Sequence, residues 1–187
     1  RIVDVLLGAL QEAVPEKVIA ACSGTMNLFN IGGVNPVNGE YFNYVETYGG
    51  GQGAMHDLDG MNAVHTHMTN TRNAPVEALE SAYPFIINEY SLVENSEGAG
   101  KFRGGLGLRR SISIETDESH VTLGTDRHDI KPWGVKGGKS GAASKTLLIH
   151  NNGDKELLPT KFSKRLEEKG ITILTETPGG GGWGDPL

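Results

Sequence analysis

Clusters of glycine restrict the fold of this sequence more than any other feature. Glycine accounts for 27 of the 187 residues, about twice the ~7% share that is typical of proteins. Four short runs hold many of them, at residues 49–51, 104–105, 137–138 and 179–182. The three-residue period of collagen is absent, and large apolar residues throughout the chain argue against disorder. We therefore expect an ordered fold in which these runs take positive φ or approach something closely.

Charge and cysteine content exclude several classes of protein. The formal net charge is -6, from 23 acidic and 17 basic side chains, so we expect no basic surface for nucleic acid or anionic membranes. No apolar run approaches the roughly 18–20 residues that a bilayer requires. The one cysteine, Cys22, cannot form an internal disulfide, which favours a cytoplasmic protein.

Local patterns predict an α+β fold, with an N-terminal helix and a loop-rich segment followed by a β-rich C-terminal half with glycine-rich turns. Apolar residues between Ile2 and Leu10 fall on one face of a helix that Pro15 would stop. Because this helix starts at the first residue and without Met, we expect the chain to be part of a longer polypeptide.

The remaining elements are predicted from propensity and from the positions of glycine and proline. Residues 16–40 are expected to form loops with one possible strand, residues 75–81 a short helix, and residues 161–169 a short helix or a polar loop. An internal boundary is possible near residue 83. Strands are expected at residues 41–46, 85–93, 108–115, 121–123, 146–150 and 171–175.

Two histidines at alternate positions are the first candidate metal ligands. His65 and His67 would share one face of a strand, which suits Zn²⁺ or Mn²⁺, and His56, Asp57 and Asp59 lie nearby in the sequence. The alternative is that these histidines only form hydrogen bonds in a turn-rich segment. That alternative is favoured, because neither a cysteine nor a tight two-histidine, one-carboxylate spacing accompanies them.

Fork-shaped polar side chains follow directly at Asn70, Arg72 and Asn73. Such groups can bind a planar amide, a carboxylate or a phosphate. They can equally hold the backbone of a loop, and the sequence leaves both interpretations open. Cys22 is interpreted as a small buried residue rather than a nucleophile, because no partnered histidine lies near it in the sequence.

Two glycine-rich segments are predicted to shape the fold around a site. Residues 96–107 contain a lysine, but an aromatic residue follows it and no helix begins there, so phosphate binding is disfavoured. A rigid turn that delivers Arg103 fits this segment better. Residues 177–186 are predicted to form an ordered turn rather than a flexible tail. The structural glycines of these segments are expected to be Gly104, Gly105, Gly180 and Gly181.

Taken in order, these segments resemble the C-terminal part of the B component of the hydantoinase B/oxoprolinase family. This family includes N-methylhydantoinase B, 5-oxoprolinase, and acetone and acetophenone carboxylases. Several motifs in the same order make the resemblance specific, and it covers about residues 1–187. The matching pieces are residues 50–54, 59–60, 68–77, Glu80, 83–84, Tyr90, 96–107, Arg127, 132–134, 137–138 and 177–186.

The resemblance implies a subunit longer than this chain, which would form its C-terminal third or so. Family members work with an A component of actin-like ATPase fold, expected to hold ATP and Mg²⁺ and to phosphorylate an oxygen of the substrate. They hydrolyse cyclic amides (5-oxoproline, hydantoins, lactams) or carboxylate ketones. The resemblance places a divalent metal, Zn²⁺ or Mn²⁺, in the N-terminal part of the B component. No metal is therefore expected in this segment, where His65 and His67 would line a pocket wall.

These considerations predict part of an ATP-dependent cyclic-amide hydrolase, with residues 65–80 and 96–107 near the reaction pocket. An ATP-dependent ketone carboxylase is one alternative, and a non-catalytic scaffold segment is another. The expected partners are the remainder of the B component, the A-type ATPase and a small-molecule substrate. No catalytic residue is assigned. The candidates for the substrate pocket are Asn70, Arg72, Asn73, Glu77 and Arg103.

Overall fold

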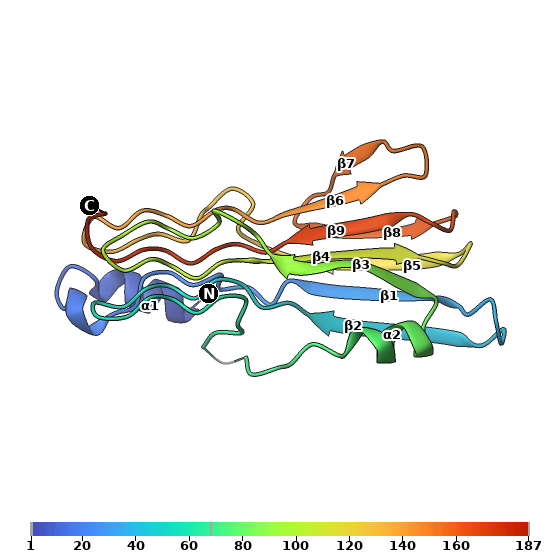
Figure 1. Ribbon diagram of the computed structural model, residues 1–187, viewed down its shortest axis with the longest axis horizontal. Helices are drawn as coiled ribbons and strands as arrows, with labels where there is room; N and C mark the ends of the chain where they lie inside the picture. Colours follow the sequence, from blue (N-terminus) through green and yellow to red (C-terminus); the bar gives the residue numbers. More distant parts are fainter. Residues whose placement is uncertain (1, 68, 187) are drawn as a thin grey trace.

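Two antiparallel β-sheets lie face to face in the half of the molecule that contains the strands (Figure 1). The computed structural model describes residues 2–67 and 69–186, so Met68 of the motif above lies outside the described residues. The first sheet, ordered β2-β1-β5-β8, contains β1 (Leu28–Val34), β2 (Tyr41–Thr47), β5 (Ser119–Gly124) and β8 (Lys161–Leu166). The second, ordered β3-β4-β9-β6-β7, contains β3 (Phe85–Leu92), β4 (Leu108–Ile114), β6 (Lys145–Ile149), β7 (Lys155–Leu157) and β9 (Thr172–Glu176).

Helices contribute little to the described structure. They are α1 (Ile2–Leu10), a 3₁₀ turn (Pro15–Lys17) and α2 (Val76–Ala82). None of the helices within residues 2–67 and 69–186 is long and apolar enough to cross a membrane.

Alternating burial along the strands builds the core between the sheets. In β2 every second residue is buried, which turns Phe42, Tyr44 and Glu46 inward. Aromatic rings continue the core toward α2, where the ring centroids of Tyr44 and Tyr83 lie 5.0 Å apart. The apolar cluster joins both sheets and includes Phe29, Ile31, Val121, Ile112, Leu148 and Ile173.

The protein is mostly β-sheet, and its strands come from both halves of the sequence. The first sheet begins with β1 and β2, so strand structure is not restricted to the C-terminal half. The segment 161–169, predicted to be a short helix or polar loop, instead contains β8, paired with β5. Its many charges misled the prediction because β8 is an edge strand, where exposed lysines are typical.

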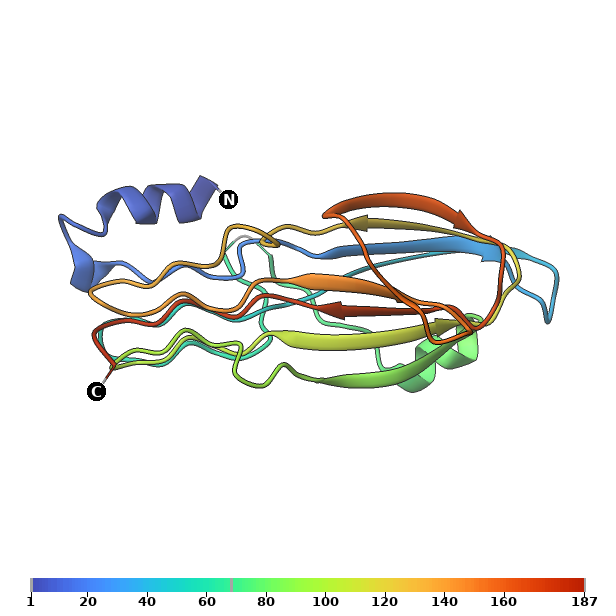
Figure 2. The same ribbon diagram turned by 90° about the horizontal axis from the view of Figure 1, so that it is seen from above.

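Beyond the strand ends, the chain continues as extended segments that run side by side at the end of the molecule carrying α1 (Figures 1 and 2). Residues 179–182 donate backbone N–H groups to the carbonyls of Ala21, Gly105 and Lys139 and accept one from Ala54. A strand in a sheet has two neighbours, whereas this segment is bonded to four others. We therefore call the assembly the glycine bundle, made of residues 20–24, 49–64, 96–107, 132–142 and 177–184.

Close approach of backbone to backbone explains the glycines of this bundle. A Cβ atom at Gly105 would overlap the carbonyl oxygen of Met61, and one at Gly180 would overlap that of Gln52. Gly104 and Gly181 face the carbonyls of Gly180 and Trp133 in the same way, and none of these four glycines has positive φ. They are needed for packing between straight segments, not for a left-handed turn.

Replacing Gly105 with Ala is expected to destabilise the protein by roughly 1–3 kcal/mol or more, since backbone must move to admit the methyl group. Gly124→Ala is the matched control, because a Cβ there would lie 3.4 Å from Leu28 Cβ, an ordinary contact. Thermal unfolding followed by circular dichroism measures both. Equal Tm values for the two variants would contradict this account of the bundle.

Candidate functional site

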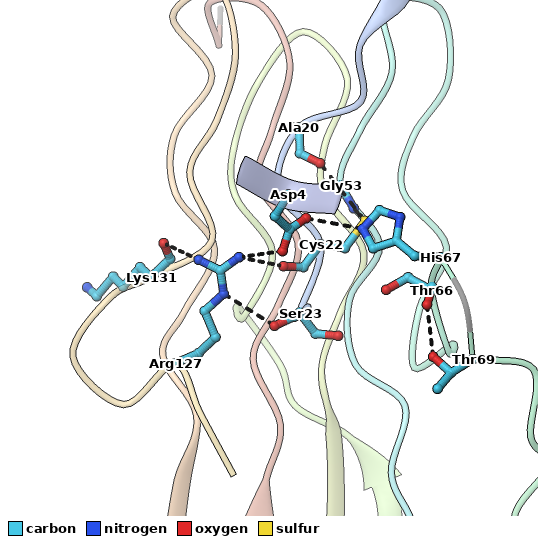
Figure 3. Close-up of polar contacts among 10 residues, drawn as sticks. All are labelled: Asp4, Ala20, Cys22, Ser23, Gly53, Thr66, His67, Thr69, Arg127 and Lys131. Carbon is cyan, nitrogen blue, oxygen red and sulfur yellow. Dashed lines mark hydrogen bonds and ion pairs between the residues drawn. The ribbon is translucent and has the colours of Figure 1, made fainter. Parts of the chain in front are cut away.

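A buried polar cluster lies where α1 packs against the glycine bundle (Figure 3). Asp4 Oδ2 accepts a hydrogen bond from Arg127 Nη2 at 2.8 Å, and Asp4 Oδ1 lies 3.1 Å from His67 Nε2. The side chains of Asp4 and Arg127 are 5% and 3% exposed, and that of His67 is 18% exposed. The cluster therefore joins three distant parts of the sequence, with Asp4 and Arg127 buried and His67, an exposed residue overall, on its solvent side.

Helix α1 has an unexpected orientation. Its large apolar residues Ile2, Val5, Leu6 and Leu10 are exposed, whereas Asp4 is the residue that it buries. The helix is anchored instead through Leu7 and Gly8, which pack near Trp133 of the bundle. The helical pattern in the sequence thus does not mark the face that packs on this chain.

Local backbone shape holds the cluster in place. Arg127 also donates to the carbonyls of Cys22, Ser23 and Lys131, each at 3.3 Å. Gly24 has φ of +61°, and a Cβ at this position would overlap Asp4 Oδ2. Residue 24 must therefore be glycine for the carboxylate to reach the guanidinium.

Cys22 completes the cluster and lies next to Asp4 and His67 (Figure 3). It is 1% exposed, and its Sγ accepts a hydrogen bond from the Gly53 N–H at 3.4 Å. Burial raises the pKa of the thiol to about 11, so at neutral pH the unliganded side chain is a thiol and a poor nucleophile.

A cavity of about 380 Å³ adjoins this cluster. Its wall is mainly apolar and includes Ile2, Val3 and Met26, and its polar lining residues are Thr25, Thr66, His67 and Thr69. His67 is therefore shared by the cluster and the cavity, and a molecule in the cavity would contact the cluster at this residue.

The two candidate histidines do not act as a pair. His67 has φ of +60° and faces Asp4, so the alternation of a strand does not apply between residues 65 and 67. His65 lies near Glu46 and the backbone of Thr47, and burial lowers its pKa. Within the described residues, the acidic, cysteine and histidine groups that converge are Asp4, Cys22 and His67.

The polar motif that follows has mixed roles. Asn73 donates to the carbonyl of Thr47 at 2.9 Å and accepts from the hydroxyl of Tyr90 at 3.2 Å, so it holds the loop to β2 and β3. Asn70 and Glu77 are exposed. Arg72 is also exposed, and it lines a hollow of about 240 Å³ over β2 together with Thr71 and Ala74.

Arg103 belongs to the glycine bundle, and its side chain is 42% exposed on the surface of the bundle. Its backbone N–H donates to Asp59 Oδ1 at 2.9 Å, and its guanidinium donates to Asn62 Oδ1 at 3.3 Å. Arg103 is thus bonded to residues 59–62 of the bundle, whereas Arg72 lies at the hollow over β2. The five pocket candidates therefore do not form one cluster within this chain.

Backbone N–H groups of the glycine-rich segment 96–107 form hydrogen bonds to other segments of the glycine bundle. The N–H groups of Gly98 and Gly105 bond to Gly180 and Gln52, and that of Lys101 bonds to Gly184. A phosphate loop requires such groups to point freely toward the ligand. These N–H groups therefore stabilise the glycine bundle and are not available to a phosphate group.

An ion pair across the core was not anticipated from the sequence. Arg110 of β4 is 1% exposed, and its Nη2 lies 3.3 Å from Glu46 Oε2 on the facing sheet. The guanidinium also lies 4.5 Å from the ring centroid of Tyr90. Glu46 Oε1 in turn accepts the backbone N–H of Ala74 at 3.1 Å, which fixes the loop that leads into α2.

The adjacent arginines 109 and 110 could have indicated this buried charge in the sequence, because alternation in a strand turns one of two neighbouring residues inward.

Replacing Arg110 with Met should lower the free energy of unfolding by about 3–5 kcal/mol, because Glu46 would remain buried without its partner. Arg165→Met is the control: it removes an exposed pair with Glu118 (2.7 Å) and should cost less than about 1 kcal/mol. Urea unfolding measures both variants. A loss at Arg110 no larger than at Arg165 would show that the core pair has no special structural role.

Comparison with known proteins identifies the family. The hydantoinase B/oxoprolinase family model matches residues 1–186. A protein of Pseudomonas sp. (strain NS671), provisionally named as the B component of a D-/L-hydantoinase, is 38% identical over 188 residues, covering 100% of this chain and 31% of that protein. The 5-oxoprolinase of Dictyostelium discoideum is 36% identical over 184 residues, covering 98% of this chain and 13% of that protein.

A solved structure has the same fold. The crystal structure of ATP-dependent caprolactamase from Pseudomonas jessenii matches with a TM-score of 0.75 at 27% identity, over 95% of this chain and 32% of that one. The chain thus spans about a third or less of the length of the proteins to which it is similar. Because the family model matches nearly every residue, the chain belongs to the hydantoinase B/oxoprolinase family.

Proposed function

We propose that this chain forms the C-terminal part of the substrate-processing subunit of an ATP-dependent cyclic-amide hydrolase. The observation that carries the proposal is the family match over residues 1–186. The relatives named above are a hydantoinase component, a 5-oxoprolinase and an ATP-dependent caprolactamase, and each name denotes an enzyme that opens a ring at an amide bond. A cytoplasmic location is part of the proposal and rests on the single cysteine.

The chemistry of the amide explains the need for ATP. An amide carbonyl is a poor electrophile, and phosphorylation of its oxygen activates the carbon. Addition of water there and cleavage of the ring C–N bond would give an amine and an acyl phosphate, and a second water would hydrolyse the acyl phosphate to a carboxylate and phosphate. We assign this step, with ATP and Mg²⁺, to a partner subunit with the fold of an actin-like ATPase. The remainder of the B component would hold the divalent metal, and this chain would close the substrate pocket from one side.

Among the pocket candidates, Arg72 is the residue best suited to bind substrate. Its neighbours Asn73 and Ala74 are held to β2 by hydrogen bonds to Thr47 and Glu46. The guanidinium is thereby presented from a fixed loop, at the hollow over β2. An exposed arginine on a fixed base can pair with a carboxylate or phosphate group. Asn70 and Glu77 would line the same side of the pocket.

The test uses the complete natural subunit that carries this chain, purified with its ATPase partner. ADP release is measured with 5-oxoproline, hydantoin or caprolactam as substrate. We expect substrate-dependent ADP release, and a kcat/KM at least about tenfold lower for Arg72→Gln, the loss of one charged contact. Arg165→Gln, an exposed arginine on β8, is the control and should retain full activity.

Two results would redirect this proposal. ADP release that requires bicarbonate and a ketone would identify a ketone carboxylase. Full activity in both Arg72→Gln and Glu77→Gln would favour a scaffold role for this segment.

The isolated chain is expected not to bind Mg-ATP. The backbone donors of the glycine-rich segment 96–107 that would contact phosphate are bonded to Gly180, Gln52 and Gly184 instead. Isothermal titration of the chain with Mg-ATP measures this directly. Binding in the micromolar range would contradict the assignment of ATP binding to the partner subunit.

A further inference from the structure

We propose that Asp4, Cys22 and His67 form a binding site for a thiophilic divalent cation, with Zn²⁺ as the best match. One donor atom from each residue lies within 4.8 Å of the others. The three residues come from α1, from the glycine bundle and from the loop after residue 64, and their side chains point toward one another (Figure 3). These three residues are far apart in the sequence, so they are brought together by the tertiary structure and not by a local motif.

The donor set decides the class of cation. A sulfur, an imidazole nitrogen and a carboxylate oxygen suit Zn²⁺ and its close analogue Co²⁺, whereas Mg²⁺ and Ca²⁺ prefer oxygen alone. Donor atoms around one tetrahedral zinc ion lie roughly 3–4 Å apart. The observed limit of 4.8 Å therefore requires each side chain to move inward by about 1 Å or less.

The surroundings orient the donors. Arg127 occupies Asp4 Oδ2 at 2.8 Å, which leaves Oδ1 directed at His67. The N–H of Gly53 points at Cys22 Sγ and would support a thiolate there. Residues that hold metal ligands in this way usually raise affinity by fixing the ligand geometry.

A divalent cation at this position would displace the proton of the Cys22 thiol, because the thiolate is the form of cysteine that binds metal. The thiolate and the carboxylate of Asp4, which is paired with Arg127 through Oδ2, would then both carry negative charge next to the ion. A divalent ion would take the place of the proton between Asp4 and His67. The buried pair of Asp4 and Arg127 alone would not need a sulfur or an imidazole beside it.

The cavity provides access for a further ligand. His67 lines the space of about 380 Å³ next to the cluster, so a water molecule or an oxygen of a bound molecule can approach from that side. Three protein ligands with one position left to solvent or substrate is the arrangement found in catalytic zinc sites.

The experiment compares the complete natural subunit with its Cys22→Ser variant, both freed of metal by a chelator and then titrated with Co²⁺. We expect the wild type to bind one Co²⁺ more per subunit than the variant and to show a thiolate-to-cobalt charge-transfer band that the variant lacks. Zn²⁺ should abolish the band by competition. Metal bound elsewhere in the subunit contributes equally to wild type and variant, so it does not affect the difference in Co²⁺ stoichiometry between them.

Two further variants separate a ligand role from a structural one. His67→Asn suits the positive φ at this position and should weaken Co²⁺ binding at this site at least about tenfold. His56→Gln, an exposed histidine beside Asp57, should bind like the wild type. If Cys22→Ser does not fold, the His67→Asn titration decides, together with the rise in wild-type Tm on addition of Zn²⁺.

Identical stoichiometry and spectra for wild type and Cys22→Ser, or a His67→Asn variant that binds as tightly as wild type, would overturn the proposal. The cluster would then be a hydrogen-bond network only. The readout is metal binding rather than ADP release, so its failure and a failure of the proposed enzymatic function are distinguishable.

Discussion

Contact of backbone with backbone in the glycine bundle is the constraint on which the rest of the structure depends. The bundle continues the strands: residues 49–64 follow β2, residues 96–107 lie between β3 and β4, and residues 177–184 follow β9. Thr177 marks one such junction, since its hydroxyl donates to the carbonyl of Gly49 and accepts the N–H of Leu108. The distances between segments of the glycine bundle therefore influence how the two sheets are positioned relative to each other.

The bundle also explains where polar side chains can gather. Segments this close have no room for side chains between them, so side chains project from the outer surface, where α1 covers Cys22 and Arg127. The second polar centre has a different origin, because Arg110 and Glu46 meet across the core between the sheets. One centre positions the start of the chain against the bundle, and the other positions the loop that presents Arg72.

Most of the strands could be predicted from the sequence, since β-forming residues bounded by glycine and proline recur at β2, β3, β4, β6 and β9. The prediction failed at β8, where the charges of an edge strand hide the alternation, and it treated β1 as one possibility within a loop. Both strands pair with β5, and β1 also pairs with β2. A third strand, β7, was not predicted, because it is only three residues long and exposed at the edge of its sheet.

The candidate site could be predicted only in part. The motif at residues 65–73 indicated a polar segment, but the positive φ of His67 directs it to Asp4 and away from His65. The meeting of Asp4 with Arg127, 123 positions apart, depends on the register of the glycine bundle. That register follows from close backbone contacts among many segments, and no local pattern in the sequence encodes it.

The position of residues 177–184 has a consequence for the order in which the protein folds. These residues are bonded to the segments around Ala21, Ala54, Gly105 and Lys139, so the bundle lacks its shared partner until they have been synthesised. Earlier segments can pair within the sheets during translation, because hairpins such as β1 with β2 involve nearby residues. A chain that ends before residue 177 would therefore contain paired strands but an incomplete bundle, so Trp133, against which α1 packs, would lack the support of residues 177–184.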